Sequence, residues 1–427
     1  MEKGWSHCGH HGGRCGVFYV TFISIIIIQM KRIRQVILKQ VDTIVVGFVM
    51  MSVFSYIMFV VKYDSDLILH ARAALNMLNG HRLLSNNFLM YFMANLLSLF
   101  SGSFVSIQVA LVLLISLSNT AKYVLVREAF GDFCTRNQAK IASLALLFVY
   151  IIPVLYFLKV FGVFLNTNTM YLGYSVPNVW HNSTILCMMP FAILAYLLSV
   201  KQFNEDFDKK RNGLISLFVV IGVLIKPSFF FVYAVAYPIL AWSKYRFRKE
   251  FFYSLIPVLL GGLCVVYEFV SIYDPLQAMD VSDNSGVVVD VWPLFTLEFW
   301  KSRLLKLMIS LVFPFLYVLG YWKTIIKERE FWFVLIMLAV AFGISWCCYE
   351  TGPRASHGNF DWQVICSMWF VFFYMLKTIV TKDVVLATDS GKCTLNNRGK
   401  VYMGLYAVHV MMGLYYLVRF LVTKDFG

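Results

Sequence analysis

Residues 44–61, IVVGFVMMSVFSYIMFVV, carry no charged side chain. A helix needs about 20 predominantly apolar residues to cross roughly 30 Å of hydrocarbon. Stretches of this kind recur along the 427 residues, of which 60% are hydrophobic and 14% charged. Their apolar residues run continuously and do not alternate, which favours helices over the strands of a membrane barrel. The sequence therefore predicts an all-α, polytopic integral membrane protein.

About eleven transmembrane helices are expected from Met30 onward, and residues 30–427 are interpreted as one transmembrane domain. Residues 1–29 are interpreted as an extension of uncertain status, and the His and Cys residues among them match no zinc-binding spacing. Residues 88–100 are apolar but short, which predicts an interfacial or re-entrant helix. The predicted spans are 41–62, 104–126, 141–164, 184–200, 213–226, 228–243, 251–272, 303–321, 331–347, 363–380 and 401–421.

The formal net charge of +14 follows from Lys and Arg residues that cluster at the ends of hydrophobic runs. The positive-inside rule explains this placement without a nucleic-acid partner. Basic residues are concentrated in 31–39, 127–140, 201–211, 244–249, 323–329 and 377–400, which assigns these segments to the cytoplasmic side. The loops predicted to face outward from the plasma (inner) membrane are 63–103, 165–183, 273–302 and 348–362.

The first outward loop contains Asp64, Asp66 and His70, followed by Gly80. Its apolar residues recur at helical spacing, and Gly80 suits a helix end, so a short surface helix is expected. Asp66 and His70 are four residues apart and share one face of that helix. The aspartates either cap the helix or take part in catalysis, and the two roles are compatible.

The second outward loop ends in the segment PNVWHN, residues 177–182. Amides, an imidazole and an aromatic ring at the membrane surface favour a carbohydrate-like ligand, which needs hydrogen bonds and an aromatic face. Trp180 also suits an interfacial aromatic belt, and Asn182 begins a glycosylation pattern that lies too close to a span for easy modification. The candidate ligand-binding residues here are Asn178, Trp180, His181 and Asn182.

Three further side chains are candidate partners for a lipid phosphate: Lys226, Arg354 and His357. Lys226 lies between two apolar runs, and the other two lie in the last long outward loop. A cation at the membrane boundary needs a partner. The alternative is that Lys226 and Arg354 reach ordinary lipid headgroups by snorkelling.

The first half of the chain resembles bacterial glycosyltransferases of the GT-C fold. The resemblance rests on the aspartate-containing first loop, on VREAFG at 126–131, on KPS at 226–228 and on PNVWHN. It implies transfer of a sugar from a polyprenyl-phosphate donor to a lipid-linked or small saccharide acceptor at the outer face, in the synthesis of a cell-envelope polysaccharide. It also implies that Asp66, or else Asp64, is the general base, and that His70 orients the carboxylate or contacts substrate. No metal ligands are predicted, although the resemblance is compatible with a divalent ion.

Two other functions remain open. An O-antigen-type polymerase or ligase also handles lipid-linked glycans, but such proteins usually carry a long outward loop rich in Arg and His in the C-terminal half, and the loop at 348–362 is short. A transporter of lipid-linked glycans often has inverted repeats and ionisable residues at mid-membrane. No repeat is visible, and the candidate residues gather at one face.

Overall fold

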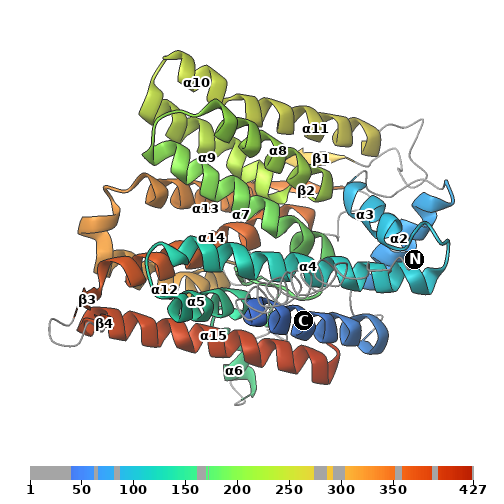
Figure 1. The fold of residues 1–427 in the computed structure, drawn as a ribbon, viewed down its shortest axis with the longest axis horizontal. Coiled ribbons are helices and arrows are strands. Elements are labelled where there is room, and N and C mark those ends of the chain that lie inside the picture. The colour runs from blue at the N-terminus through green and yellow to red at the C-terminus, as the bar shows by residue number, and fades with distance from the viewer. Residues whose placement is uncertain are drawn as a thin grey trace, which may run out of the picture.

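The computed structural model describes residues 40–61, 66–80, 87–160, 170–171, 173–273, 286–291, 303–351, 358–386 and 393–425. After the helix Gln40–Val61, the α-helices are α2 (Asp66–Leu78), α3 (Leu89–Leu97), α4 (Phe104–Gly131), α5 (Arg136–Phe148), α6 (Val154–Val160), α7 (Ser183–Asn204), α8 (Lys209–Ile225), α9 (Ser228–Tyr245), α10 (Lys249–Ser254), α11 (Ile256–Tyr273), α12 (Leu305–Ile325), α13 (Arg329–Cys347), α14 (Trp362–Lys382) and α15 (Asn397–Thr423). The predicted all-α class is confirmed (Figure 1).

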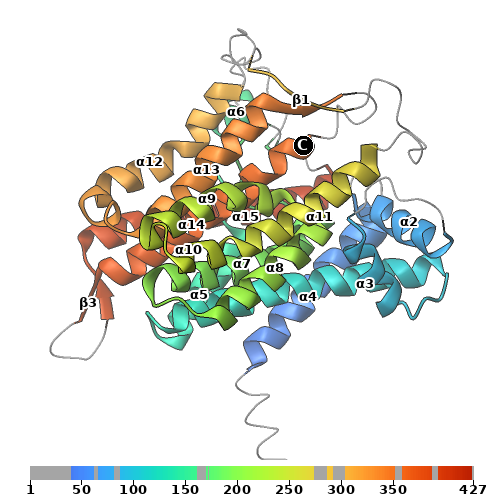
Figure 2. The same ribbon diagram turned by 90° about the horizontal axis from the view of Figure 1, so that it is seen from above.

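Four short strands form two antiparallel pairs. β1 (Val287–Val289) pairs with β2 (Cys348–Glu350), and β3 (Val384–Leu386) pairs with β4 (Cys393–Leu395). Each pair lies at one end of the helical bundle, with β1 and β2 near α11 and with β3 and β4 at the opposite end (Figures 1 and 2). The strands thus lie at helix ends, and Leu395 of β4 packs against the edge of the core.

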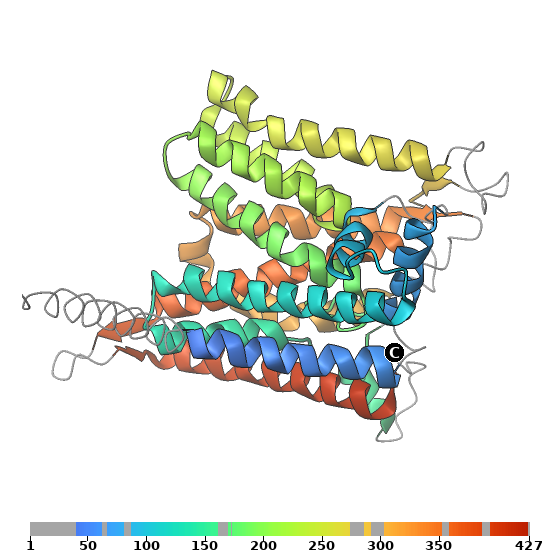
Figure 3. The ribbon, with the colours of Figure 1, turned by 45° about the vertical axis from the view of Figure 1, so that its right-hand side comes forward.

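Eight helices in the described residues are long and apolar enough to cross a membrane, and each corresponds to one predicted span. The remaining three predicted spans are not confirmed. Helices α8, of 17 residues, and α9, of 18 residues, are continuous and lie with α7 and α11 in one part of the bundle (Figure 3), but they are not among the eight. The chain is therefore a membrane-embedded helical bundle with at least eight candidate spans.

The predicted span 141–164 is not one continuous helix in the described residues. α5 ends at Phe148, and α6 begins at Val154 after Pro153, which lacks the backbone N–H that a continuous helix requires. The interruption is stabilised by α15: the Tyr150 N–H donates to the His409 carbonyl at 3.1 Å, and His409 Nδ1 lies 2.6 Å from the Tyr150 carbonyl oxygen. Buried backbone groups that leave a helix need such partners.

The first outward loop folds as the sequence predicts. α2 begins at Asp66 and ends at Leu78, and Gly80 has φ +74°, the left-handed conformation that glycine adopts without strain. The nine-residue α3 is too short to span and corresponds to the predicted interfacial helix. α2 packs against α3 and α4, and it also contacts α7. These contacts place the start of α2 beside the start of α7.

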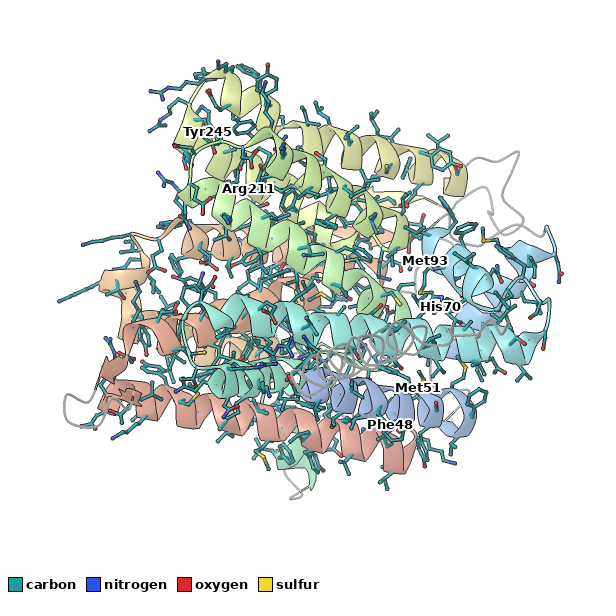
Figure 4. All side chains as sticks on the ribbon, in the orientation of Figure 1. Phe48, Met51, His70, Met93, Arg211 and Tyr245 are labelled. Atoms are coloured by element: carbon teal, nitrogen blue, oxygen red, sulfur yellow. The ribbon has the colours of Figure 1, made fainter. Side chains whose placement is uncertain are left out.

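The described residues of the predicted outward loops lie at one end of the bundle. α2, α3 and β1 occupy that end, and β3 and β4 lie at the other (Figures 1 and 2). Figure 4 shows the same separation in side chains, with His70 at one end and Arg211 and Tyr245 at the far end. The fold therefore gathers segments far apart in sequence around the starts of α2, α7, α9 and α14.

Candidate functional site

Asp66 occupies the first turn of α2 and is half-buried. Its Oδ2 accepts a hydrogen bond from Asn182 Nδ2 at 3.2 Å. Asn182 is the N-cap of α7, where its Oδ1 accepts from the Ile185 N–H at 3.0 Å and from the Thr184 hydroxyl at 2.9 Å. The cap fixes the Asn182 amide, and the amide in turn fixes the carboxylate, so two residues from separate loops form one hydrogen-bonded unit.

Asn182 is also the first residue of the glycosylation pattern at 182–184, and its accessibility decides whether it can be modified. The side chain is 4% exposed, and both ends of its amide are hydrogen-bonded. An enzyme that modifies the amide nitrogen needs access to it, and this packing denies that access. The packing thus argues against modification of Asn182 in the folded protein and gives its amide a role in holding the Asp66 carboxylate.

His70 lies one turn after Asp66 on α2, and its Nδ1 is 2.9 Å from the Tyr91 hydroxyl of α3. Burial lowers the pKa of His70 from 6.5 to about 3, and the positive charge of Lys226 contributes to this lowering. The imidazole is therefore neutral at pH 7, with one ring nitrogen that donates and one that accepts. In that state His70 can hydrogen-bond a substrate or position its neighbours, but it is a poor proton donor.

Lys226 follows the last turn of α8, and Pro227 separates it from α9, as the sequence predicts. Its Nζ lies 5.0 Å from the centroid of the Trp362 ring at the start of α14, within the range of a cation–π interaction. The positive charge of this ammonium group acts on His70 as well. Lys226 is half-buried, and its charge acts on the part of α2 that carries His70.

Three rings form an aromatic wall beside Lys226. The centroid of the Tyr171 ring lies 4.9 Å from that of His181, and the Trp362 centroid lies 6.0 Å from His181 and 6.3 Å from Tyr171. Burial lowers the pKa of His181 from 6.5 to about 3, so this imidazole is also neutral at pH 7. Burial raises the pKa of Tyr171, and the negative charges of Asp361 and Asp66 add to that rise.

We call this arrangement the Asp66 cluster. It combines a carboxylate, a cation, two neutral imidazoles, an amide, two phenol rings and an indole. Asp66, His70, Tyr171 and Lys226 keep partial exposure, whereas the others are buried. The cluster consists of Asp66, His70, Tyr91, Tyr171, His181, Asn182, Lys226 and Trp362.

Two predicted ligand-binding residues do not join the cluster. Trp180 is buried between Phe148, at a ring-centroid distance of 5.6 Å, and Phe54, at 6.1 Å. Asn178 Nδ2 donates to the carbonyls at the end of α5, at 2.8 Å to Val149 and 3.3 Å to Leu146. Both side chains stabilise the segment that leads to His181, and neither presents a surface to a ligand in this structure.

Three predicted residues, Asp64, Arg354 and His357, lie outside the described residues. The neighbouring part of the last outward loop is described and reaches the cluster through Trp362. Asp361, next to it, accepts a hydrogen bond from the Ser345 hydroxyl. The loop at 348–362 therefore contributes to the site through Trp362, whereas the sequence predicts contributions from Arg354 and His357.

Four polar residues in this part of the fold were not predicted from the sequence: Tyr91, Tyr171, Trp362 and the buried Lys122. Tyr91, Trp362 and Lys122 lie in or at the edge of apolar stretches, where hydropathy averaging hides a single polar atom. A charge inside a predicted span is a recognisable signal, and Lys122 lies within the predicted span 104–126. The tyrosines and Trp362 offer no comparable signal.

No group of three or more His, Cys, Asp or Glu side chains within the described ranges is arranged to hold a metal ion. No protein-family model and no curated protein sequence matches the chain. The function must therefore be argued from the cluster itself.

Proposed function

We propose that the protein is a membrane glycosyltransferase of the GT-C type, which transfers a sugar from a polyprenyl-phosphate donor to a lipid-linked or small saccharide acceptor. The observation that carries this proposal is the pairing of Asp66 with Asn182, one turn along α2 from His70, whose imidazole lies within reach of the Lys226 charge. Such a site offers a base for a hydroxyl and a cation for a phosphate. We place it at the outer face of the plasma membrane, because the basic loops lie at the other end.

In the proposed reaction, the Asp66 carboxylate accepts the proton of an acceptor hydroxyl. The hydroxyl oxygen forms a bond to the anomeric carbon of the donor sugar, while the bond from that carbon to the phosphate oxygen breaks and the electron pair leaves with the polyprenyl phosphate. General-base help of this kind contributes roughly 10²–10⁴ in rate. The Asn182 amide holds the carboxylate in place for this step.

Lys226 supports the departing phosphate. The leaving group gains negative charge as the bond to the sugar breaks, and a fixed ammonium group nearby stabilises that charge. The cation–π contact with Trp362 holds the Lys226 side chain near the cluster. The neutral imidazoles of His70 and His181, with Tyr171, supply hydrogen bonds and ring edges that suit sugar hydroxyls.

A transporter of lipid-linked glycans is the second candidate, because two observations favour it. The interruption between α5 and α6 resembles the broken helices of secondary transporters, and Lys122 places an ionisable group inside a candidate span. A transporter would bind the same lipid-linked sugars without breaking the bond to phosphate.

A donor screen separates these possibilities. Purified protein is incubated with a panel of polyprenyl-phosphate sugars and with a membrane lipid extract as the acceptor source, and released polyprenyl phosphate is quantified. The proposed function predicts release from at least one donor, together with a new glycosylated product. Donor movement across proteoliposomes with no release from any donor would reject the transferase and favour transport. Repeated extension of one lipid-linked glycan would identify a polymerase.

A further inference from the structure

Glu268 is a buried carboxyl group that the proposed reaction does not use. It lies in α11, three residues before the end of the candidate span Lys249–Ser271, and it is 3% exposed. Its Oε1 has no hydrogen-bond partner among the described residues, and the Asn87 side chain hydrogen-bonds the carboxyl group. Ionisable side chains inside a membrane are costly, and they commonly mark sites where ions or protons bind.

The burial of Glu268 follows from the way α11 packs on α8. Figure 1 shows α11 at the edge of the bundle beside α8. Gly261, Cys264 and Glu268 recur at intervals of three and four residues, so they share one face of α11. A Cβ atom at Gly261 would lie only 2.9 Å from Val219 Cγ1 of α8, so this face turns toward α8. The glycine thus permits the close approach of the two helices that buries Glu268.

Asn87 connects Glu268 to the last turn of α8. Asn87 Nδ2 donates to the Val223 carbonyl at 3.3 Å, and the same side chain hydrogen-bonds Glu268. Val223 lies three residues before Lys226, which follows the end of α8. The carboxyl group is therefore held at the outer end of α8, although it is not part of the Asp66 cluster.

A negative charge on Glu268 would lack a compensating cation. Within the described part of the chain, no lysine, arginine or histidine forms an ion pair with it. Glu330, in the candidate span α13, shows the alternative: it is 7% exposed, and Lys377 Nζ lies 2.6 Å from its Oε2. An isolated buried carboxylate is strongly unfavourable, whereas a neutral carboxylic acid loses much less on burial. The surroundings of Glu268 therefore favour the neutral acid.

Two other titratable side chains bear on this assignment. Cys264, one turn earlier on α11, interacts electrostatically with Glu268, but a thiol supplies no positive charge. The Lys226 ammonium group lies 5.0 Å from the centroid of the Trp362 ring of α14 and forms no printed ion pair with Glu268 in the described ranges. Helix α9 meets this face of α11 with an apolar ring, that of Phe230, which lies close to Gly261.

We propose that Glu268 is a proton-binding site near the outer end of α11, where the carboxyl group carries a proton at neutral pH and exchanges it with water on the outer side of the membrane. Three residues correspond to about 4.5 Å along a helix, so the path from Glu268 to the end of the span is short. The inference does not depend on the transfer reaction. For the transporter candidate, an exchangeable proton would supply a coupling ion.

Infrared spectroscopy of the full chain in nanodiscs at pH 7 tests the protonation state directly. The spectrum of Glu268→Gln is subtracted from that of the wild type, since Gln removes the acid and keeps the size of the side chain. We expect the difference to show the carbonyl band of a protonated carboxylic acid and to lack the bands of a carboxylate. Glu128→Gln is the matched control: Glu128 is exposed near the end of α4, and an exposed glutamate is ionised at pH 7, so its difference spectrum should show carboxylate bands.

Transfer to D2O then shows whether the proton exchanges. The acid band should shift to lower frequency, because deuterium replaces the bound proton. A band that keeps its frequency would overturn the proposal, since a sealed acid with a purely structural role does not exchange. Carboxylate bands in the Glu268→Gln difference spectrum would also overturn it, and bands that appear only with Na⁺ in the buffer would assign the site to that cation. If Glu268→Gln does not fold, Glu268→Leu replaces it, because an apolar side chain of similar size suits a buried face.

Discussion

Replacing Asn182 by Asp keeps the helix cap of α7 and changes the group that faces Asp66. Asp is as good an N-cap as Asn, so its carboxylate still accepts from the Ile185 N–H. The Nδ2 donor at 3.2 Å from Asp66 becomes an oxygen that cannot donate when ionised. The substitution therefore removes one hydrogen bond and adds one negative charge at the same position.

The expected effect combines two losses. A hydrogen bond to a charged group contributes about 1.5–3 kcal/mol, which corresponds to roughly 10- to 100-fold in rate if the bond orients the reacting carboxylate. Two adjacent carboxylates also share a proton, so the pKa of Asp66 rises and less of it is ionised at neutral pH. Transfer by Asn182→Asp should fall by at least about tenfold at pH 7 and recover in part as the pH rises.

The assay is the initial rate of polyprenyl phosphate release against pH, with Asn182→Ser as the matched control. Ser also caps a helix, but its side chain is too short to reach Asp66, so this variant loses the bond without gaining a charge. Asn182→Ser should be slower than wild type with a nearly unshifted pH profile, whereas Asn182→Asp should be slower with its profile displaced to higher pH. A folded Asn182→Asp with the rate and pH profile of wild type would refute the role assigned to the Asp66–Asn182 pair.

Three further predictions concern other parts of the molecule. Lys226→Met should lower kcat/KM for a polyprenyl-phosphate donor by about tenfold or more in steady-state kinetics, because the departing phosphate loses the ammonium group that stabilises it. Lys226→Arg should keep part of the wild-type kcat/KM because the charge is kept. Equal kcat/KM for Lys226→Met and the wild type would contradict this role. Burial lowers the pKa of His70 from 6.5 to about 3, so the stability of α2 packing is greatest above pH 6.5 and falls with pH below that value, by up to about 1.4 kcal/mol per pH unit. Hydrogen exchange of the α2 amides should therefore be faster at pH 5 than at pH 7 beyond the intrinsic effect of pH, and His70→Gln should remove this difference. An equal pH response in the wild type and His70→Gln would count against the assignment. Asp383→Asn should destabilise the β3–β4 end by about 1.5–3 kcal/mol in thermal unfolding, because the half-exposed Arg398 loses the buried carboxylate to which it donates; an unchanged midpoint would contradict this.

Hydropathy was sufficient to predict eight helices that are long and apolar enough to cross a membrane, because each is a long apolar run between charged segments. It did not predict the interruption within 141–164, because a window average of hydropathy does not register whether the backbone can form continuous helical hydrogen bonds. Pro153 was the available cue, but the carbonyl and imidazole of His409, which stabilise the interruption, are far away in sequence. Such a long-range partner cannot be read from local composition.

The candidate site could be predicted in part for a similar reason. Asp66, Asn182 and Lys226 each occupy a helix end that the sequence marks with turn or capping residues, and the distribution of basic loops predicts that all three lie on the same side of the membrane. No turn or capping residue marks Tyr91 or Trp362, because an aromatic residue in an apolar stretch is equally compatible with a lipid-facing and a core position. Their place in the cluster depends on how α3 and α14 pack, which only the three-dimensional structure defines.

The role of Asp66 as the general base is tested most directly by comparing Asp66→Asn with Asp132→Asn in the transfer assay. Asp132 is an exposed carboxylate at the end of α4, so the control makes the same chemical change away from the cluster. With an authenticated donor and acceptor, Asp66→Asn should lower kcat by roughly 10²–10⁴ while Asp132→Asn stays close to wild type. Equal turnover by a folded Asp66→Asn protein and the wild type would show that Asp66 is not the base.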